Sequence, residues 1–442
     1  MAAQGTWTEA HVRRLFWRAG FGATPEEASR WAGRGRDATI KFMLDGGGGP
    51  ELVGPAPDIG QPLDPVNEWG HDVLWWLDRM IRSQRPLVEK MTLFWHDHFA
   101  TLDQDTPLML AQNRKLRRHA LGDFRRLLRE VTRDPAMQLF LSLAGSTKYA
   151  PNENFARELM ELFTLGKGYS ERDVREAARA LTGFQDRWEN GDFKGIRYDK
   201  RLHDTGVKRI FGKRGRFDWR DVLELVVAHK NHPPFLVGKL WDFYVTSPID
   251  RRTRSRLAKL YRRSRHRIKP VVAEILKHPA LFSDLDRPDM VKSPVVFVAG
   301  NLRMAGAGVQ TDDWAWLLGG MGQQLFEPPS VAGWEWGPPW MSTNTIKARF
   351  SAVTYLTRKG AQLHLPDGST PPDLSPADAV ARARAAVGEP WTSAETNGSL
   401  ERMAASYFSD LRPSDRRRQQ RADMLQRALR HLLLSGPDAQ LH

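Results

Sequence analysis

The hydrophobic positions of this chain recur with the spacing of amphipathic helices along nearly its whole length. Apolar residues return every three or four positions in one segment after another, whereas the strict alternation of a half-buried strand is nearly absent. Glycine and proline residues fall between these segments and mark their ends. The pattern predicts a mainly α, large multi-helix, bundle-like globular protein with few or no strands.

One region departs from the helical pattern. Residues 319–340 combine tryptophans with repeated glycines and prolines, so we expect an irregular Gly/Trp/Pro-rich insert that packs over the helices. Further on, stretches rich in Pro, Ser and Thr surround a short helix and precede two closing helices. This organisation predicts a single large helical domain over residues 1–350 and a C-terminal extension over residues 351–442.

Residues 151–183 read as two capped helices separated by a glycine stop. Asn152 is placed to accept from the first free backbone N–H groups, and Gly166 allows a left-handed exit from the first helix. Ser170 with Asp173 three residues later resembles a capping box for the second helix. The stretch predicts a helical pair with well-defined ends.

The polar side of the first of these helices carries Arg157, Glu158 and Glu161. The two carboxylates are one turn apart, and Arg157 reaches Glu161 at the i, i+4 spacing. Glu158 borders the apolar side, where partial burial is expected. This arrangement is typical either of a carboxylate pair for metal or proton chemistry or of a solvated face with an ordinary ion pair, and the helix by itself favours the second interpretation.

Two histidines close together, His96 and His98, lie near the end of another helical segment that begins at Pro86. On a regular helix they point nearly opposite ways, about 200° apart, and cannot bind one metal ion together. If the chain is already extended at residue 96, both face one side. His98 shares the apolar face, either as a core histidine or as a ligand, whereas His96 is expected to be exposed unless the helix ends early.

The composition narrows the class of protein. Among 442 residues, 41% are hydrophobic and 27% charged, which is ordinary for a globular protein, and no run of about 18 apolar residues predicts a membrane span. Cysteine is absent, which excludes disulfides, thiolate metal sites and a cysteine nucleophile. The first residues show no secretory signal, so the sequence as it stands predicts a cytoplasmic protein, or an exported one if a leader was removed.

The net charge of +14 favours an acidic or anionic partner. Residues 251–269 hold ten Lys or Arg and no acid, interleaved with apolar residues, which predicts an amphipathic helix with a basic outer face. Nucleic-acid binding would also call for a second basic surface, stacking aromatic residues or a known motif. None is evident, so the basic run favours a solvated helix face, and nucleic-acid binding is a less favoured alternative that rests on charge alone.

Several motifs together carry a resemblance to a known family. The longest are Phe94-Trp95-His96-Asp97-His98-Phe99, Asn152-Glu153-Asn154 with the following helix to Gly166, and Ala178-Arg179-Ala180-Leu181-Thr182-Gly183; His203-Asp204, His232-Pro233, Lys292 with Pro294, and Gly333-Trp334 agree. This combination resembles the bacterial family catalogued as domain of unknown function 1800 (DUF1800), over about residues 15–349. The resemblance implies a mostly helical fold, no established reaction, and a sulfatase-like protein as partner. Many members of that family are exported, and this chain departs from them in showing no signal.

Two classes of function fit these residues, and whether the protein is an enzyme stays open. The first is an enzyme, hydrolytic in one version, in which imidazole and carboxylate groups bind a divalent metal ion or act as general acid and base. Its catalytic candidates are Glu158, Glu161, Arg157 and His98; its metal candidates are His96, His98, Glu158 and His203; its substrate-binding candidates are Trp334, Trp340 and Tyr169. The alternative is a non-catalytic binding or assembly protein whose motif is a structural ion-pair network.

Overall fold

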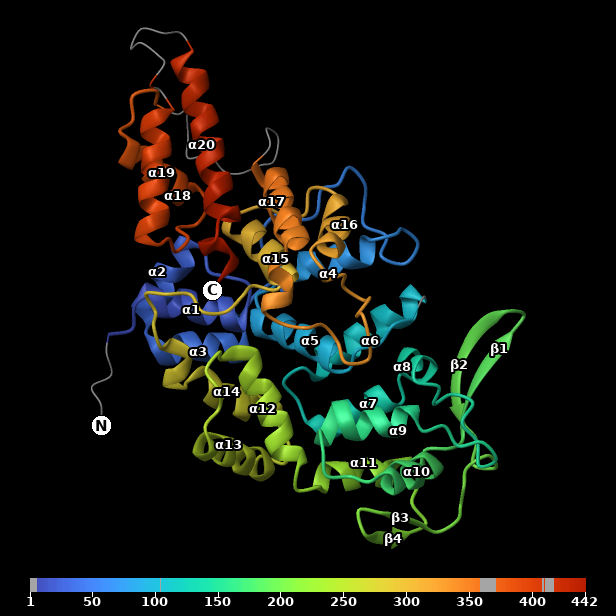
Figure 1. Ribbon diagram of the computed structural model, residues 1–442. Coiled ribbons are helices and arrows are strands. Elements are labelled where there is room, and N and C mark those ends of the chain that lie inside the picture. Colours follow the sequence, from blue (N-terminus) through green and yellow to red (C-terminus); the bar gives the residue numbers. More distant parts are fainter. Residues whose placement is uncertain (1–5, 104, 358–370, 408, 410–416) are drawn as a thin grey trace. The chain divides into compact units, whose positions relative to one another are not determined.

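Helices dominate the computed structural model, which describes residues 6–103, 105–357, 371–407, 409 and 417–442. The strands of the described residues form two small two-stranded antiparallel sheets (Figure 1). The expected mainly α class is therefore confirmed. No helix of the described residues combines the length and the apolar character needed to cross a membrane.

The chain divides into two compact units. Unit 1 comprises Met1–Leu87, Phe282–Leu325 and Glu335–His442, and unit 2 comprises Val88–Leu281 and Phe326–Trp334. Each is described by itself below. The expected division between residues 350 and 351 stays a prediction.

Unit 1 is built from helices that bury one apolar face each. On α1, for example, Val12, Leu15 and Phe16 are fully buried. The chain then turns at Thr24, whose hydroxyl accepts from the Glu27 backbone N–H at 3.3 Å while Glu27 accepts from the Thr24 backbone N–H at 3.0 Å. The helices are α1 (Glu9–Ala19), α2 (Pro25–Arg34), α3 (Arg36–Asp45), α4 (His71–Arg82), α15 (Pro294–Met304), α16 (Asp313–Gly320), α17 (Thr343–Thr357), α18 (Pro376–Ala386), α19 (Ala394–Ser406) and α20 (Arg418–Ser435), with the 3₁₀ turns η3 (Pro338–Met341) and η4 (Asp438–Gln440). Helix α15 packs on α4, and α18, α19 and α20 lie side by side (Figure 1).

Unit 2 combines helices with both small sheets. Its elements are the main part of α5 (Pro86–His98), α6 (Thr106–His119), α7 (Phe124–Thr132), α8 (Pro135–Phe140), α9 (Asn154–Glu158), η1 (Leu159–Leu165), α10 (Glu171–Ala180), β1 (Phe184–Glu189), β2 (Asp192–Tyr198), β3 (Lys208–Ile210), β4 (Lys213–Gly215), α11 (Trp219–Ala228), α12 (His232–Tyr244), α13 (Arg251–Arg263) and α14 (Ile268–Leu276), followed by the 3₁₀ turn η2 (Pro279–Phe282). Strands β1 and β2 form a hairpin in which Phe184 pairs with Tyr198, and a bulge interrupts the register at Arg187/Trp188. Helix α13 buries Leu257 and Tyr261, as its apolar stripe predicts.

The motif of residues 151–183 keeps its predicted ends but not its predicted interior. Asn152 accepts from the Asn154 backbone N–H at 2.9 Å, and Ser170 and Asp173 form the expected capping box. Between these ends, α9 passes into a π-helix, η1, instead of continuing as an α-helix to Gly166. Gly166 ends η1 with a φ of 70°, and an added Cβ there would lie 2.8 Å from the Phe235 ring, so only glycine fits without a shift.

Part of the Gly/Trp/Pro-rich insert packs against α5, as expected. The backbone N–H of Trp334 donates to the Asp97 carboxylate at 2.8 Å, and that of Phe326 donates to Nε2 of His96 at 3.1 Å. Gly333 has a φ of 84°, and an added Cβ would lie 2.7 Å from the Asp97 carbonyl oxygen. The close approach of these two backbones therefore depends on glycine.

Candidate functional site

The polar residues of α9 and η1 form an ion-pair cluster that differs from the expected one. Arg157 donates to Glu153 at 3.1 Å and to both carboxylate oxygens of Glu171 at 2.8 Å. The expected pair with Glu161 is absent because the chain is π-helical from Leu159 onward, which removes Glu161 from the α-helical i+4 position. About a third of the Arg157 side chain is exposed, so these pairs contribute little to stability.

Glu161 and Tyr169 form the second half of this cluster. The Tyr169 hydroxyl donates to Glu161 at 2.9 Å, and burial, followed by this hydrogen bond, raises the pKa of Tyr169 to about 12. Glu158 is half-buried, as expected, and desolvation followed by the charge of Glu161 raises the pKa of its carboxyl group. A carboxyl group with a raised pKa beside a second carboxylate is a common arrangement for proton transfer.

His98 lies in the core, on the apolar face of α5 where the sequence places it. Its Nε2–H donates to the carbonyl oxygen of Phe163 in η1 at 3.0 Å, and its ring stacks on Phe94. Burial lowers its pKa well below the ordinary value, so the ring is neutral. His98 thus fixes α5 to η1.

His96 is buried, which corrects the expectation that it faces solvent. Helix α5 does continue past residue 96, so the two histidines point different ways, but the segment Phe326–Trp334 covers the side on which His96 lies. The His96 ring lies 5.5 Å from the Trp334 ring, and burial lowers its pKa to about 3. The residues around His96 could not predict this burial, because the covering segment Phe326–Trp334 is distant in the sequence.

The proposed metal ligands are not brought together as a set. Nδ1 of His203 bonds the carbonyl oxygen of Thr182 at 3.0 Å, while the neighbouring Asp204 pairs with Arg179 at 2.8 Å. Residues 6–103, 105–357, 371–407, 409 and 417–442 contain no group of three His, Asp or Glu side chains that could hold a metal ion. The metal site of His96, His98, Glu158 and His203 stays a prediction.

The tryptophans expected to bind substrate are packed inside their own units. Trp334, in unit 2, is 6% exposed and contacts His96. Trp340, in unit 1, is 4% exposed and meets Trp336 edge to face at 4.9 Å. Tyr169 differs from both because it belongs to the polar cluster beside Glu161.

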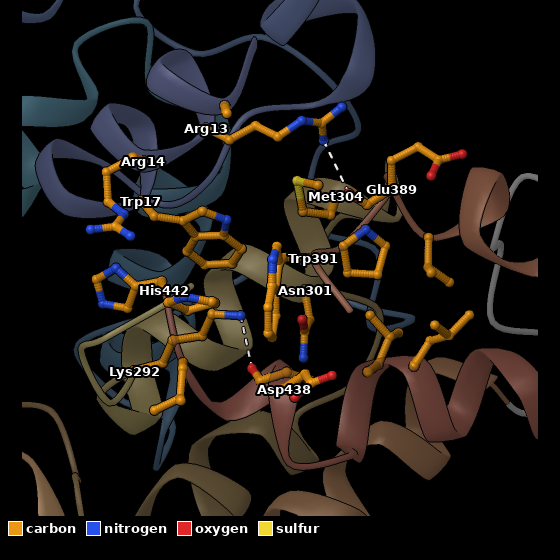
Figure 2. Close-up of a pocket in the computed structure, with 18 of the residues that line it drawn as sticks. Arg13, Arg14, Trp17, Lys292, Asn301, Met304, Glu389, Trp391, Asp438 and His442 are labelled. Carbon is orange, nitrogen blue, oxygen red and sulfur yellow. Dashed lines mark hydrogen bonds between the residues drawn. The ribbon is translucent and has the colours of Figure 1, made fainter. Parts of the chain in front are cut away.

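Unit 1 contains a cavity of about 130 Å³ that the sequence did not reveal (Figure 2). Its lining comes from α1, α15, α20, η4 and the segment after α18, and most of it is apolar. Trp17 and Trp391 supply two indole rings, and Lys292 and Asn301 supply buried polar groups. Trp391 is 36% exposed and lies where the cavity meets the surface.

The position of the Trp17 ring depends on a glycine of α15. A Cβ added at Gly300 would lie 2.2 Å from the Trp17 ring, so any larger residue would displace the indole. Lys292 directly precedes α15, and Ser293 caps that helix by accepting from the Val296 backbone N–H at 3.3 Å. The Trp17 indole thus lies against Gly300 within α15 and also meets the ammonium group of Lys292, which precedes that helix.

Lys292 is held on both sides by backbone hydrogen bonds. Its N–H donates to the Gln440 carbonyl oxygen at 2.8 Å, and its own carbonyl oxygen accepts from Arg349 at 2.8 Å. Its ammonium group donates to the carbonyl oxygen of Ala439 at 2.8 Å and lies 4.1 Å from the centre of the Trp17 ring. Burial, and then the charge of Arg349, lowers the pKa of Lys292 to about 7.

Asn301 leaves a polar group unpaired at this cavity. The residue is 3% exposed, and its Nδ2 has no hydrogen-bond partner among the described residues. Buried polar groups are nearly always hydrogen-bonded to protein or to water, so this amide N–H is available to an acceptor in the cavity. The one sequence signal for this site was the pair Lys292 and Pro294, which carried part of the family resemblance but suggested no role.

Comparison with known proteins gives one match. The model of a family described as "Protein of unknown function (DUF1800)" matches residues 14–441. The match runs well past residue 349, where the expected resemblance ended, and so includes the helices that close the cavity. No curated protein and no solved structure matches the chain.

Proposed function

The chain belongs to the DUF1800 family, and we propose that it is a small-molecule-binding protein whose site is the cavity of unit 1. The unpaired Nδ2 of Asn301 carries this proposal, because a ligand oxygen would supply the acceptor that the protein lacks. Lys292 offers further N–H groups on the same cavity. The expected ligand therefore has a carbonyl or carboxylate oxygen.

The rest of the ligand is expected to be small, flat and apolar. A cavity of about 150 Å³ lined by apolar side chains holds benzene, and the cavity of about 130 Å³ here is slightly smaller, so its size limits the ligand to a single ring. The indoles of Trp17 and Trp391 offer aromatic faces to such a ring. A single aromatic ring with one oxygen-bearing substituent meets both requirements.

Binding is testable with benzoate and benzyl alcohol as probes, because a ligand beside Trp17 and Trp391 changes tryptophan fluorescence. We expect saturable binding of at least one probe. Asn301→Leu removes the donor at nearly constant volume and should weaken that binding roughly 2- to 10-fold, as expected for one hydrogen bond.

Asn113→Leu provides the matched control, since Asn113 is equally buried and also lacks partners for its amide, but lies in unit 2. This control should leave the affinity unchanged. Failure of both probes to bind, or equal weakening by both substitutions, would contradict the proposal.

For the motif of residues 151–183, the hydrogen bonds favour an architectural role. The last carbonyl groups of a helix lack donors within that helix, and in η1 two of them accept from histidines. His98 donates to the Phe163 oxygen, and Nδ1 of His232 in α12 donates to the Thr164 oxygen at 3.0 Å. We infer that the motif joins α5, η1 and α12. Loss of stability in His232→Phe, with unchanged probe binding, would support this role, whereas unchanged stability would contradict it.

A second candidate function is acid–base catalysis at Glu158 and Glu161. The raised pKa of the half-buried Glu158 favours it, since a general acid must keep its proton near neutral pH. The test is hydrolysis of a panel of nitrophenyl glycosides and esters. Glu158→Gln should abolish any activity found, while Glu171→Gln, which only removes a partner of Arg157, should preserve it. Equal activity of the wild type and Glu158→Gln would exclude this candidate.

An acidic protein is the partner that α13 favours. Most of its basic residues are exposed, and among them Arg256 pairs with Glu274 at 2.9 Å. Such a face attracts acidic partners over a distance of about one Debye length. A poly-aspartate peptide should bind at low salt and dissociate as salt rises, and Arg252→Glu with Arg263→Glu should weaken binding. An affinity for the peptide that changes neither with salt nor in the charge-reversed variant would refute an acidic partner.

A further inference from the structure

Lys292 has an environment that favours the neutral amine. It is 6% exposed and faces a mainly apolar cavity, and the nearby cation Arg349 disfavours its charged form. No acidic side chain forms an ion pair with it in the part of the chain that the structure describes. A buried ammonium without a carboxylate partner is costly, and loss of its proton removes that cost.

Two other lysines whose pKa is lowered, Lys208 and Lys239, are placed differently. Lys208 donates to the carbonyl oxygen of Phe217 at 2.9 Å and lies 3.9 Å from the Asp204 carboxylate. Burial lowers the pKa of the partly exposed Lys239, and the carboxylate of Asp97 opposes this shift. Neither lines the cavity of unit 1. The combination of a cavity, a neighbouring cation and a depressed pKa belongs to Lys292.

The geometry directs the reactive side of Lys292 into the cavity. The side-chain nitrogen donates to the carbonyl oxygen of Ala439, so the lone pair of the neutral amine must point away from that oxygen. Figure 2 shows the end of the Lys292 side chain pointing toward the indole ring of Trp391, and Asn301 on the other side of that ring. Asn301 brings an unused N–H donor to the same space.

We propose that Lys292 is a nucleophile that forms an imine with a small aromatic aldehyde or ketone held in this cavity. The inference rests on the proposed function, and it narrows the ligand oxygen to a carbonyl oxygen. The neutral amine is the form that attacks carbonyl compounds in lysine-dependent enzymes. Asn301 acts as a positioning residue that donates to the carbonyl oxygen.

The reaction requires no oxidant or reductant. The lone pair of Nζ adds to the carbonyl carbon, the C–N bond forms, and the C–O π bond becomes an oxygen lone pair. A proton moves from nitrogen to that oxygen and gives a carbinolamine. The hydroxyl group then leaves as water after a second protonation, the nitrogen lone pair forms the C=N bond, and the resulting iminium returns a proton to solvent.

The test uses benzaldehyde with sodium cyanoborohydride, which reduces an imine to a stable benzylamine that peptide mass spectrometry locates. We expect Lys292 to be labelled at least 10-fold faster than any other lysine in the wild type. Lys292→Arg keeps the positive charge and should abolish this label while preserving the thermal melting temperature. Lys239→Met, which removes a partly buried lysine of unit 2, should leave the label intact.

Benzyl alcohol separates the two proposals because it has the same ring but cannot form an imine. If benzyl alcohol binds but does not reduce the labelling of Lys292, imine formation at Lys292 is wrong while the binding function stands. The same conclusion follows if benzyl alcohol binds and the label spreads evenly over the lysines. If neither benzyl alcohol nor benzoate binds and no label appears, both proposals fail. Selective labelling of Lys292 that benzyl alcohol suppresses supports both, and Asn301→Leu should slow that labelling several-fold.

Discussion

Acid should destabilise unit 2 through its buried histidines, and His96 allows the effect to be tested residue by residue. Burial lowers the pKa of His96 and of His232 to about 3, against an ordinary value of 6.5. Between pH 6.5 and 3 the unfolded chain therefore binds protons that the folded chain does not. Stability is fully present above pH 6.5 and is lost as the pH falls toward 3.

The magnitude follows from proton linkage. Each such histidine removes about 1.4 kcal/mol of folding free energy per pH unit in this window, so the step from pH 6.5 to 5 costs roughly 2 kcal/mol per histidine. His96→Gln removes one of these protons and retains an acceptor for the Phe326 backbone N–H. The variant should lose about 1.4 kcal/mol per pH unit less than the wild type over the same range.

Hydrogen exchange of peptides from α5, measured at several pH values after correction for the intrinsic exchange rate, reports the local free energy of opening. Phe99→Leu is the control, because it weakens the same core without removing a titrating group, and its pH slope should equal that of the wild type. A slope in His96→Gln equal to that of the wild type would refute the burial of His96 beneath Phe326–Trp334.

Three further substitutions test the packing and the ion pairs. Gly300→Ala should lower the stability of unit 1 by about 1–3 kcal/mol and weaken probe binding, since its Cβ would displace the Trp17 ring; calorimetry and fluorescence titration check both effects. Glu89→Ala should cost about 3–5 kcal/mol, because Glu89 is 1% exposed and accepts from Arg117 at 2.8 Å, whereas Arg157→Ala should cost less than about 1 kcal/mol at its exposed cluster. Equal losses in urea unfolding would contradict the contrast between a buried and a surface pair.

Features set by neighbouring residues could be predicted from the sequence. The caps at Thr24 and Ser170 involve partners three residues away, and both form as their spacing indicates. Gly166 ends its helix because no other residue adopts that backbone as readily. The apolar stripes also depend on nearby residues, because they repeat with a period of 3.6 residues, and they predicted the mainly α class.

Features set by distant partners could not be predicted. An α-helix and a π-helix present similar apolar sequences, and here the carbonyl groups of η1 are satisfied by His98 and His232, which lie 65 and 68 residues from their acceptors. The burial of His96 depends on Phe326, 230 residues away. The cavity requires segments from both ends of unit 1, and no periodicity reports a space between side chains.

The distant partners of His98 and His232 also indicate what these two histidines do. A ligand or catalytic histidine needs a ring nitrogen that the protein leaves free. Both nitrogens of His232 are used, one by Thr164 and the other by the Tyr261 hydroxyl at 2.9 Å, whereas His98 uses Nε2 for a carbonyl group of η1 and keeps Nδ1 buried without a hydrogen-bond partner among the described residues. A π-helix is less stable than an α-helix, so it persists where such donors satisfy its last carbonyl groups. The motif that is most recognisable in the sequence therefore supports the core of unit 2, whereas the lysine and the unpaired amide that offer chemistry belong to the cavity of unit 1.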